Sequence, residues 1–213
     1  MLMDGTERFP RRAEAARATR RRVVAAAAAL FEQRGYPATS IVAIAEAADV
    51  AEQTVYAAFG NKRTLLAEAV DQAIAGDDEP IAVNDRDWMQ PVWNAPDPAS
   101  RLRSYAAAVV FIHERAARIF RVLEVAAPGT PELDDLWRET LARRRQGAAA
   151  VIAPLADHGD LCRDLTIEEA TDVMWAMNGP EIYLNLVERQ NWSPDRYTAW
   201  LGDALVRLLL RPA

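Results

Sequence analysis

Apolar residues recur at three- and four-residue steps along most of this 213-residue chain. That spacing marks one buried face of an α-helix. No stretch sustains the period-two alternation of a strand, and clusters of Gly, Pro and Asp separate the periodic segments. The pattern therefore predicts an all-α fold. The predicted helices cover residues 11–34, 41–48, 51–59, 61–75, 98–126, 131–156, 166–190 with an interruption at Gly179-Pro180, and 194–210.

Residues 39–66 contain two short predicted helices joined by a tight turn, followed by the start of a third. Thr39 and Ser40 carry hydroxyls that can cap the first of these helices. Asp49 stands at the turn, where an acidic side chain tolerates a left-handed backbone. Asn61 follows Gly60 and can cap the third helix. Two helices with such a turn form a helix-turn-helix, whose second helix can lie in a DNA major groove.

The pattern I-A-x-A-A-x-V-x-x-x-T-V-Y-x-x-F-x-N-K-x-x-L-L, which begins at Ile44, resembles the DNA-binding domain of the tetracycline-repressor (TetR) family. The resemblance covers about residues 15–72. It is specific because the Tyr, Phe, Asn-Lys and Leu-Leu positions all have the family's spacing. Asp49 departs from the pattern, since the family usually has Gly there. The resemblance implies a DNA-binding transcriptional regulator, a repressor released by a small, largely apolar or aromatic ligand, and not an enzyme.

The second helix of this motif supplies most of the predicted DNA contacts. The amide of Gln53 can pair bidentately with adenine, and Thr54 can meet a thymine methyl group or a phosphate. By the resemblance, Tyr56 lies where a hydroxyl meets phosphate, and Lys62 lies where an amine clamps the DNA backbone. The predicted DNA-binding residues are Thr39, Ser40, Glu52, Gln53, Thr54, Tyr56, Ala57 and Lys62.

The distribution of charge changes the meaning of the net charge of −6. Residues 1–63 hold ten Lys or Arg against seven Asp or Glu, whereas the remainder holds fifteen against twenty-four. A basic N-terminal part on an acidic body suits a protein that touches DNA with one end. The arginines before the motif are interpreted either as a solvated helix face or as phosphate contacts. They are Arg11, Arg12, Arg17 and Arg20 to Arg22.

The predicted organisation is a three-helix DNA-binding domain over residues 11–60, a linking helix over 61–75 and a body over 76–213. The body is expected to bind an effector and to dimerise. Residues 76–99 are rich in Pro and Asp and form the natural boundary. Within them, Trp88, Met89, Val92 and Trp93 are expected to form a short helical turn that packs back on the body.

The TetR resemblance implies a ligand pocket between the central helices of the body. Aromatic residues with a few polar groups would suit an apolar or aromatic molecule, although each one alone is more often plain core. The pocket candidates are Phe111, His113, Trp137, Met174, Trp175, Asn178 and Tyr183. The run Arg143 to Arg145 is interpreted as a solvated helix face.

The same resemblance implies that residues 166–210 form a four-helix bundle with a second copy of the chain. A stripe of this kind could also be core of the single chain. The predicted dimer-interface residues are Leu184, Val187, Trp200, Leu201, Ala204, Leu205 and Leu208.

Composition excludes several classes of function. The single cysteine, Cys162, excludes an intrachain disulfide and a cysteine-cluster metal site, and two histidines add no metal-ligand cluster, so no cofactor is expected. No run of eighteen apolar residues and no secretion signal is present, which indicates a cytoplasmic protein without a membrane partner. The expected partners are a double-stranded DNA operator, a second copy of the chain and an unknown small-molecule effector. The alternative is a helical enzyme or protein-interaction module carrying a non-functional helix-turn-helix, but no nucleophile–base or paired-carboxylate constellation supports catalysis.

Overall fold

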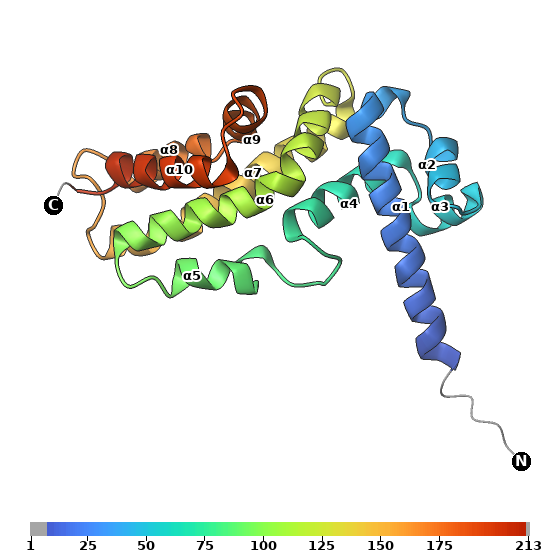
Figure 1. The fold of residues 1–213 in the computed structure, drawn as a ribbon, viewed down its shortest axis with the longest axis horizontal. Coiled ribbons are helices and arrows are strands. Elements are labelled where there is room, and N and C mark those ends of the chain that lie inside the picture. Colours follow the sequence, from blue (N-terminus) through green and yellow to red (C-terminus); the bar gives the residue numbers. More distant parts are fainter. Residues whose placement is uncertain (1–7, 212–213) are drawn as a thin grey trace, which may run out of the picture. The chain divides into compact units, whose positions relative to one another are not determined.

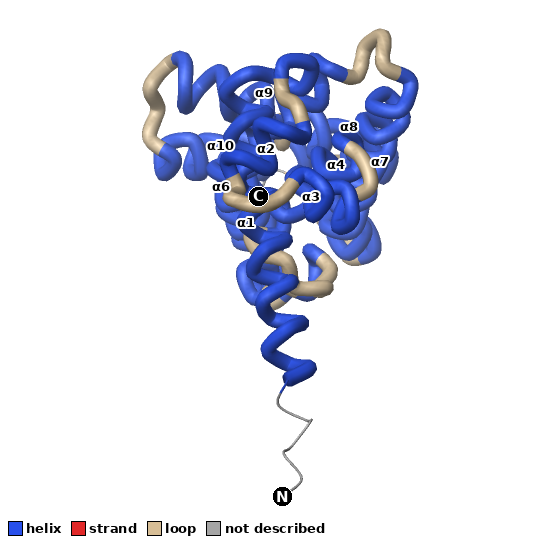
Figure 2. The backbone as a smooth tube through the Cα atoms, turned by 90° about the vertical axis from the view of Figure 1, so that its right-hand side faces the viewer, coloured by secondary structure: helices blue, strands red, loops and turns tan. Residues whose placement is uncertain are grey.

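The computed structural model describes the backbone of residues 8–211 and the side chains of residues 13–211. The chain divides into two compact units between Gln72 and Ala73, inside helix α4 (Lys62–Ala75). Within the described range, the regular structure is helical apart from one isolated antiparallel bridge between Leu161 and Leu210 (Figures 1 and 2). The predicted all-α class is confirmed. None of the helices in this range is long and apolar enough to cross a membrane.

The first unit consists of α1 (Arg8–Ala38), α2 (Ile41–Ala47), α3 (Glu52–Phe59) and most of α4. Gly35 interrupts α1 with a φ of 77°, in the left-handed region that glycine adopts without strain. The apolar faces of the four helices meet in one core. Its fully buried members include Phe31, Ile44, Leu65 and Leu66.

The helix ends of the first unit follow the local chemistry of the sequence. The Ser40 hydroxyl accepts a hydrogen bond from the Ala43 backbone N–H at 3.1 Å and caps α2. Asp49 has a φ of 53°, so it does adopt the left-handed conformation expected at the turn. Asn61 Oδ1 accepts the Thr64 backbone N–H at 2.8 Å at the start of α4. The predictions for these three positions are confirmed.

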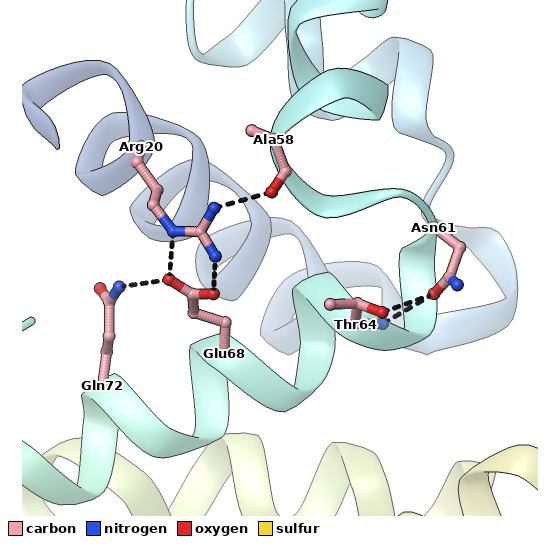
Figure 3. A network of polar contacts seen from close by, with 6 residues as sticks. All are labelled: Arg20, Ala58, Asn61, Thr64, Glu68 and Gln72. Atoms are coloured by element: carbon pink, nitrogen blue, oxygen red, sulfur yellow. Dashed lines mark hydrogen bonds and ion pairs between the residues drawn. The ribbon is translucent and has the colours of Figure 1, made fainter. Parts of the chain in front are cut away.

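A polar network ties three helices of the first unit together (Figure 3). Arg20 Nε donates to Glu68 Oε1 at 2.7 Å, and Arg20 Nη1 donates to the Ala58 carbonyl at 2.7 Å. The guanidinium also lies 4.3 Å from the centre of the Phe59 ring. Gln72 Nε2 donates to the same Glu68 oxygen at 3.3 Å. Neither interpretation of the arginine cluster therefore holds for Arg20, which fastens the end of α3 to α1 and α4.

The second unit is organised around its longest helix, α6 (Pro98–Ala126), which contacts α5, α7, α9 and α10. In Figure 1 α10 lies along α6, and α8 packs on α7. The other elements are η1 (Val83–Asp85), η2 (Asp87–Met89), α5 (Gln90–Trp93), α7 (Pro131–Asp157), α8 (Ile167–Met177), α9 (Pro180–Tyr183), the π-helical turn η3 (Leu184–Arg189) and α10 (Pro194–Leu209).

The predicted short helical segment of the second unit is confirmed. Met89 and Val92 are buried in the core, so the short helical segment does pack back on the body as predicted. Thr166 and Glu169 form a reciprocal capping box at the start of α8. Gly179 interrupts the predicted 166–190 helix, and Pro180 opens α9 after it.

Four of the predicted dimer-interface residues are largely covered by the single chain. They are buried because α10 packs along α6 and α9 packs on the same helix. Leu201 and Leu205 have no accessible surface and cannot contact a partner, so the prediction is wrong for these two, and the alternative of a single-chain core applies. Leu184 and Ala204 are 6% and 7% exposed and remain predicted interface residues. Val187 and Trp200 are half-buried, Leu208 is 47% exposed, and these three also remain predicted interface residues.

Candidate DNA-binding and ligand sites

Helix α3 packs on the core of the first unit through only one narrow face. Val55 and Phe59, one helical turn apart, are buried in the core of the first unit. The positions between and before them turn outward because the two apolar residues occupy a single stripe. Tyr56 is 49% exposed. The other predicted contacts on this helix are exposed as well, and they are Glu52, Gln53, Thr54 and Ala57.

Thr39 does not belong to this outer surface. It is only 1% exposed, and its hydroxyl donates to the carbonyls of Gly35 at 2.8 Å and Leu30 at 3.1 Å. Both carbonyls belong to the C-terminal part of α1. The predicted phosphate contact through the Thr39 side chain is therefore wrong. Ser40 is exposed, and its hydroxyl proton stays available because the oxygen serves only as an acceptor in the cap.

Lys62 has a structural role that sequence reasoning missed. Its Nζ donates to the carbonyls of Tyr36 and Thr39, both at 2.9 Å, and lies 4.1 Å from the centre of the Tyr36 ring. Burial lowers the pKa of this amine. Two of its three donors thus tie the start of α4 to the end of α1 and to Thr39, which follows it. One donor remains for a phosphate.

The helix-turn-helix geometry agrees with the comparison against known families. Residues 23–69 match the family described as bacterial regulatory proteins, tetR family. These residues are therefore similar to the DNA-binding region of that family. Proteins of this family are DNA-binding transcriptional regulators and not enzymes. No curated relative matches the chain.

Solved structures extend the tetR-family likeness over both units. NalD, the secondary repressor of the MexAB-OprM multidrug efflux pump in Pseudomonas aeruginosa, is 21% identical, with a TM-score of 0.70 over 94% of this chain and 100% of that one. A candidate TetR-family regulator from Rhodococcus sp. is 20% identical, with a TM-score of 0.67 over 90% and 99% of the two chains. A Saccharomonospora viridis protein in complex with choline is 20% identical, with a TM-score of 0.67 over 91% and 98%. At these identities the likeness shows a shared fold.

The body of the chain contains a buried polar cluster around Asn178, at the C-terminal end of α8. His113 Nε2 lies 2.9 Å from the Asn178 carbonyl, so Nε2 carries the proton and Nδ1 is left as an acceptor. Arg144 Nη2 donates to the same carbonyl at 3.2 Å and to Asn178 Oδ1 at 2.9 Å. Asn178 Nδ2 donates to the Tyr105 hydroxyl. Burial lowers the pKa of His113 to about 4 and raises that of Tyr105 to about 12.

The structure places the predicted pocket residues in two groups. His113 packs against the Tyr183 ring at 5.5 Å, and Asn178 follows Met174 and Trp175 at the end of α8. Phe111 is 41% exposed and instead contacts Trp88 and Arg115. Residues two apart on a helix point in different directions, so Phe111 cannot share a pocket with His113, and that prediction is wrong. Trp137 is half-buried on α7, two turns before Arg144.

Sequence reasoning missed Tyr105 and Arg144. The interpretation of a solvated face holds for Arg143 and Arg145, which are exposed, but it is wrong for Arg144. A signal was present, because Arg144 continues the four-residue steps of the buried face of α7. Its neighbours on that face are Leu136, Thr140 and Ala148.

Two buried tyrosines of the body are expected to respond in opposite ways to loss of their hydroxyl. The Tyr197 hydroxyl is buried and has no hydrogen-bond partner in the described part of the chain, whereas that of Tyr105 accepts from Asn178. Tyr197→Phe should stabilise the fold by about 1 kcal/mol, and Tyr105→Phe should destabilise it by about 1–3 kcal/mol, because only the second leaves a buried donor unpaired. Urea unfolding followed by tryptophan fluorescence measures both. Shifts of the same sign would contradict this expectation.

Proposed function

We propose that this chain is a tetR-family regulator, a homodimeric repressor of a double-stranded DNA operator in the cytoplasm. A small, largely apolar or aromatic molecule that binds the body releases it. The observation that carries the proposal is the exposed outer face of α3, which is held from behind by Val55 and Phe59. The name of NalD as a repressor supports repression, and the choline bound to the Saccharomonospora viridis protein supports a small-molecule effector.

In this proposal each copy of α3 occupies one of two successive major grooves, about 34 Å apart. The amide of Gln53 reads a base edge, and the hydroxyls of Tyr56 and Ser40 meet phosphates. Lys62 adds its remaining N–H to the DNA backbone. The second copy docks through the accessible positions Val187, Trp200 and Leu208.

Release follows from a difference in affinity between two dimer geometries. An effector that favours a dimer with a different head separation weakens DNA binding because one geometry cannot meet both half-sites. A tenfold loss of operator affinity needs only about 1.4 kcal/mol of differential binding.

Two substitutions on α3 test the DNA-binding surface. Gln53→Ala is expected to lower operator affinity by about 10–100-fold through a lost bidentate base contact. Tyr56→Phe removes one phosphate contact and should weaken binding by up to about tenfold, with little dependence on sequence. Both side chains are exposed, so the melting temperature should not change. A gel shift with the DNA that flanks the chain's own gene, repeated at several salt concentrations, measures these effects.

The matched control is Gln33→Ala, the same chemical change at an exposed position of α1. It should bind DNA like the wild type. Lys62 is unsuitable as a primary probe because its replacement also removes two hydrogen bonds of the fold. Wild-type affinity in the Gln53→Ala/Tyr56→Phe double variant would overturn the assignment. Absence of specific, salt-sensitive binding by the wild type would favour the protein-interaction module instead.

A further inference from the structure

Arg144 carries a positive charge that the protein balances incompletely. It is half-buried on the inner face of α7, and no carboxylate in the described part of the chain lies within 4.0 Å of its guanidinium. Its hydrogen bonds go to neutral oxygens of Asn178 and, at 3.5 Å, to the Trp175 carbonyl, and all are made by Nη2. A guanidinium has five N–H donors. Arg144 therefore caps the end of α8 with Nη2 alone. Its Nε and Nη1 donors remain available for another acceptor.

Two neighbouring side chains also lack partners. His113 is 4% exposed, and its Nδ1 makes no hydrogen bond to any residue between 13 and 211. The indole N–H of Trp175 is likewise buried and unpaired in this range, and the Trp175 ring lies 5.5 Å from Arg144 Cζ. His113 and Arg144 share the Asn178 carbonyl as acceptor, so the three groups lie close together. Buried polar groups are nearly always satisfied in folded proteins, so two such exceptions beside the spare donors of Arg144 indicate a place for a ligand.

The chemistry of these groups specifies what the ligand must offer. The free donors of Arg144 and the indole N–H of Trp175 both seek an acceptor, and a planar guanidinium matches the two oxygens of a carboxylate. His113 Nδ1 seeks an O–H or N–H donor. The rings of Phe120, 5.9 Å from Arg144 Cζ, and of Trp175 and Tyr183 provide apolar walls.

We infer that the body site takes a small organic carboxylate with an apolar or aromatic frame, whose anionic group binds Arg144. This inference rests on the proposed function, in which the body binds a small molecule, and narrows the class of that molecule. Trp175 Nε1 donates to the same carboxylate. A hydroxyl or amine on the ligand donates to His113 Nδ1.

A surface hollow lies beside this site and shares Trp175 with it. Its volume is about 510 Å³, within the range of small-molecule sites, and it lies between α7 and α8. Trp175 belongs both to its wall and to the Arg144 site, and Arg145 and Asp172 form an ion pair at 2.8 Å in the same wall. The remaining lining residues are Leu141, Ala142 and Ala176.

A ligand bound at this site is expected to affect the segments that set the dimer geometry, which follow the break between α8 and α9. Arg144 and His113 together hold the Asn178 carbonyl at the break between α8 and α9. A carboxylate that draws Arg144 away loosens this fastening. The segment that follows the break carries the predicted interface residue Val187 and leads into α10.

Calorimetric titration of the full chain tests the inference with named probes. Benzoate, 4-hydroxybenzoate and hexanoate are compared with the matching amides, which keep the shape and lose the charge. At least one acid should bind, and its amide should bind at least tenfold more weakly. Binding by none of the acids, or equal binding of acid and amide, would overturn the inference.

Three substitutions test whether Arg144 is the residue that binds the carboxylate. Arg144→Met should weaken the acid at least tenfold, while Arg143→Gln, the same loss of charge at the exposed neighbour, should leave affinity unchanged. Glu181→Gln should tighten binding, because the nearby Glu181 carboxylate favours the charged form of Arg144 and repels an anion. If Arg144→Met does not fold, Trp175→Phe keeps the ring, deletes the N–H donor and should weaken the acid several-fold. Undiminished binding in Arg144→Met, or in Trp175→Phe where that variant replaces it, would overturn the inference.

A gel shift on the same samples separates this inference from the proposed function. DNA binding without acid binding would remove the carboxylate site alone. Acid binding without DNA binding would retain the site and remove the repressor.

Discussion

Lowering the pH from about 6.5 to 4 is expected to remove about 3 kcal/mol of stability through His113 alone. Burial lowers the pKa of this residue from 6.5 to about 4, so it stays neutral in the folded chain. The unfolded chain takes up the proton at its ordinary pKa and therefore binds more protons throughout this window. The stabilising effect is complete above pH 6.5 and is lost as the pH falls toward 4.

The measurement is the free energy of unfolding in urea at half-unit pH steps, for the wild type and for His113→Leu. The variant will have a different absolute stability, so the comparison concerns the slope, which should be shallower by up to about 1.4 kcal/mol per pH unit. His158, the other histidine, is exposed, and His158→Leu serves as the matched control. Equal slopes for His113→Leu and the wild type would show that His113 is protonated in the fold.

Gly60→Ala is expected to destabilise the first unit by about 1–3 kcal/mol. Gly60 joins α3 to α4 with φ 73° and ψ −53°, a conformation that L-residues with a Cβ rarely adopt. An added Cβ meets no atom within 4 Å, so the cost lies in the backbone and not in a steric clash. The substitution is also expected to change the orientation of α3, because Gly60 forms the turn that ends this helix.

Gly147 provides the matched control because a Cβ there also meets nothing within 4 Å, while its backbone is part of α7. Gly147→Ala should stabilise the second unit by about 0.5–1 kcal/mol. All six tryptophans lie in the second unit, so their fluorescence follows that unit, whereas far-UV circular dichroism follows both. Gly60→Ala should shift only the dichroism transition if the units unfold independently. A neutral or stabilising Gly60→Ala would contradict the strained conformation.

The first unit shows how far sequence patterns reach. The caps at Ser40 and Asn61 and the left-handed turn at Asp49 depend on groups within a few residues of each other. Spacing and side-chain type are enough to predict interactions of that range. The outer positions of α3 followed in the same way, because the four-residue step between Val55 and Phe59 leaves the other side of a short helix uncovered.

Thr39 and Lys62 carry groups that suit phosphate, but both also have partners inside the fold. The Thr39 hydroxyl donates to carbonyls only four and nine residues earlier, so local spacing could have indicated this bond. Lys62 Nζ donates to carbonyls 26 and 23 residues earlier, and local spacing does not describe an approach over that separation.

The sequence by itself determined the helices of this protein, their caps, the helix-turn-helix and the stripes that must be buried, because these features arise among residues three or four positions apart. Only the tertiary structure decided what covers each stripe. It assigned Leu201 and Leu205 to the core of the single chain and turned Arg144 inward between two exposed arginines. The physical reason is that an apolar stripe is stabilised equally well by any apolar surface, and the chain's own long-range packing selects which one it meets.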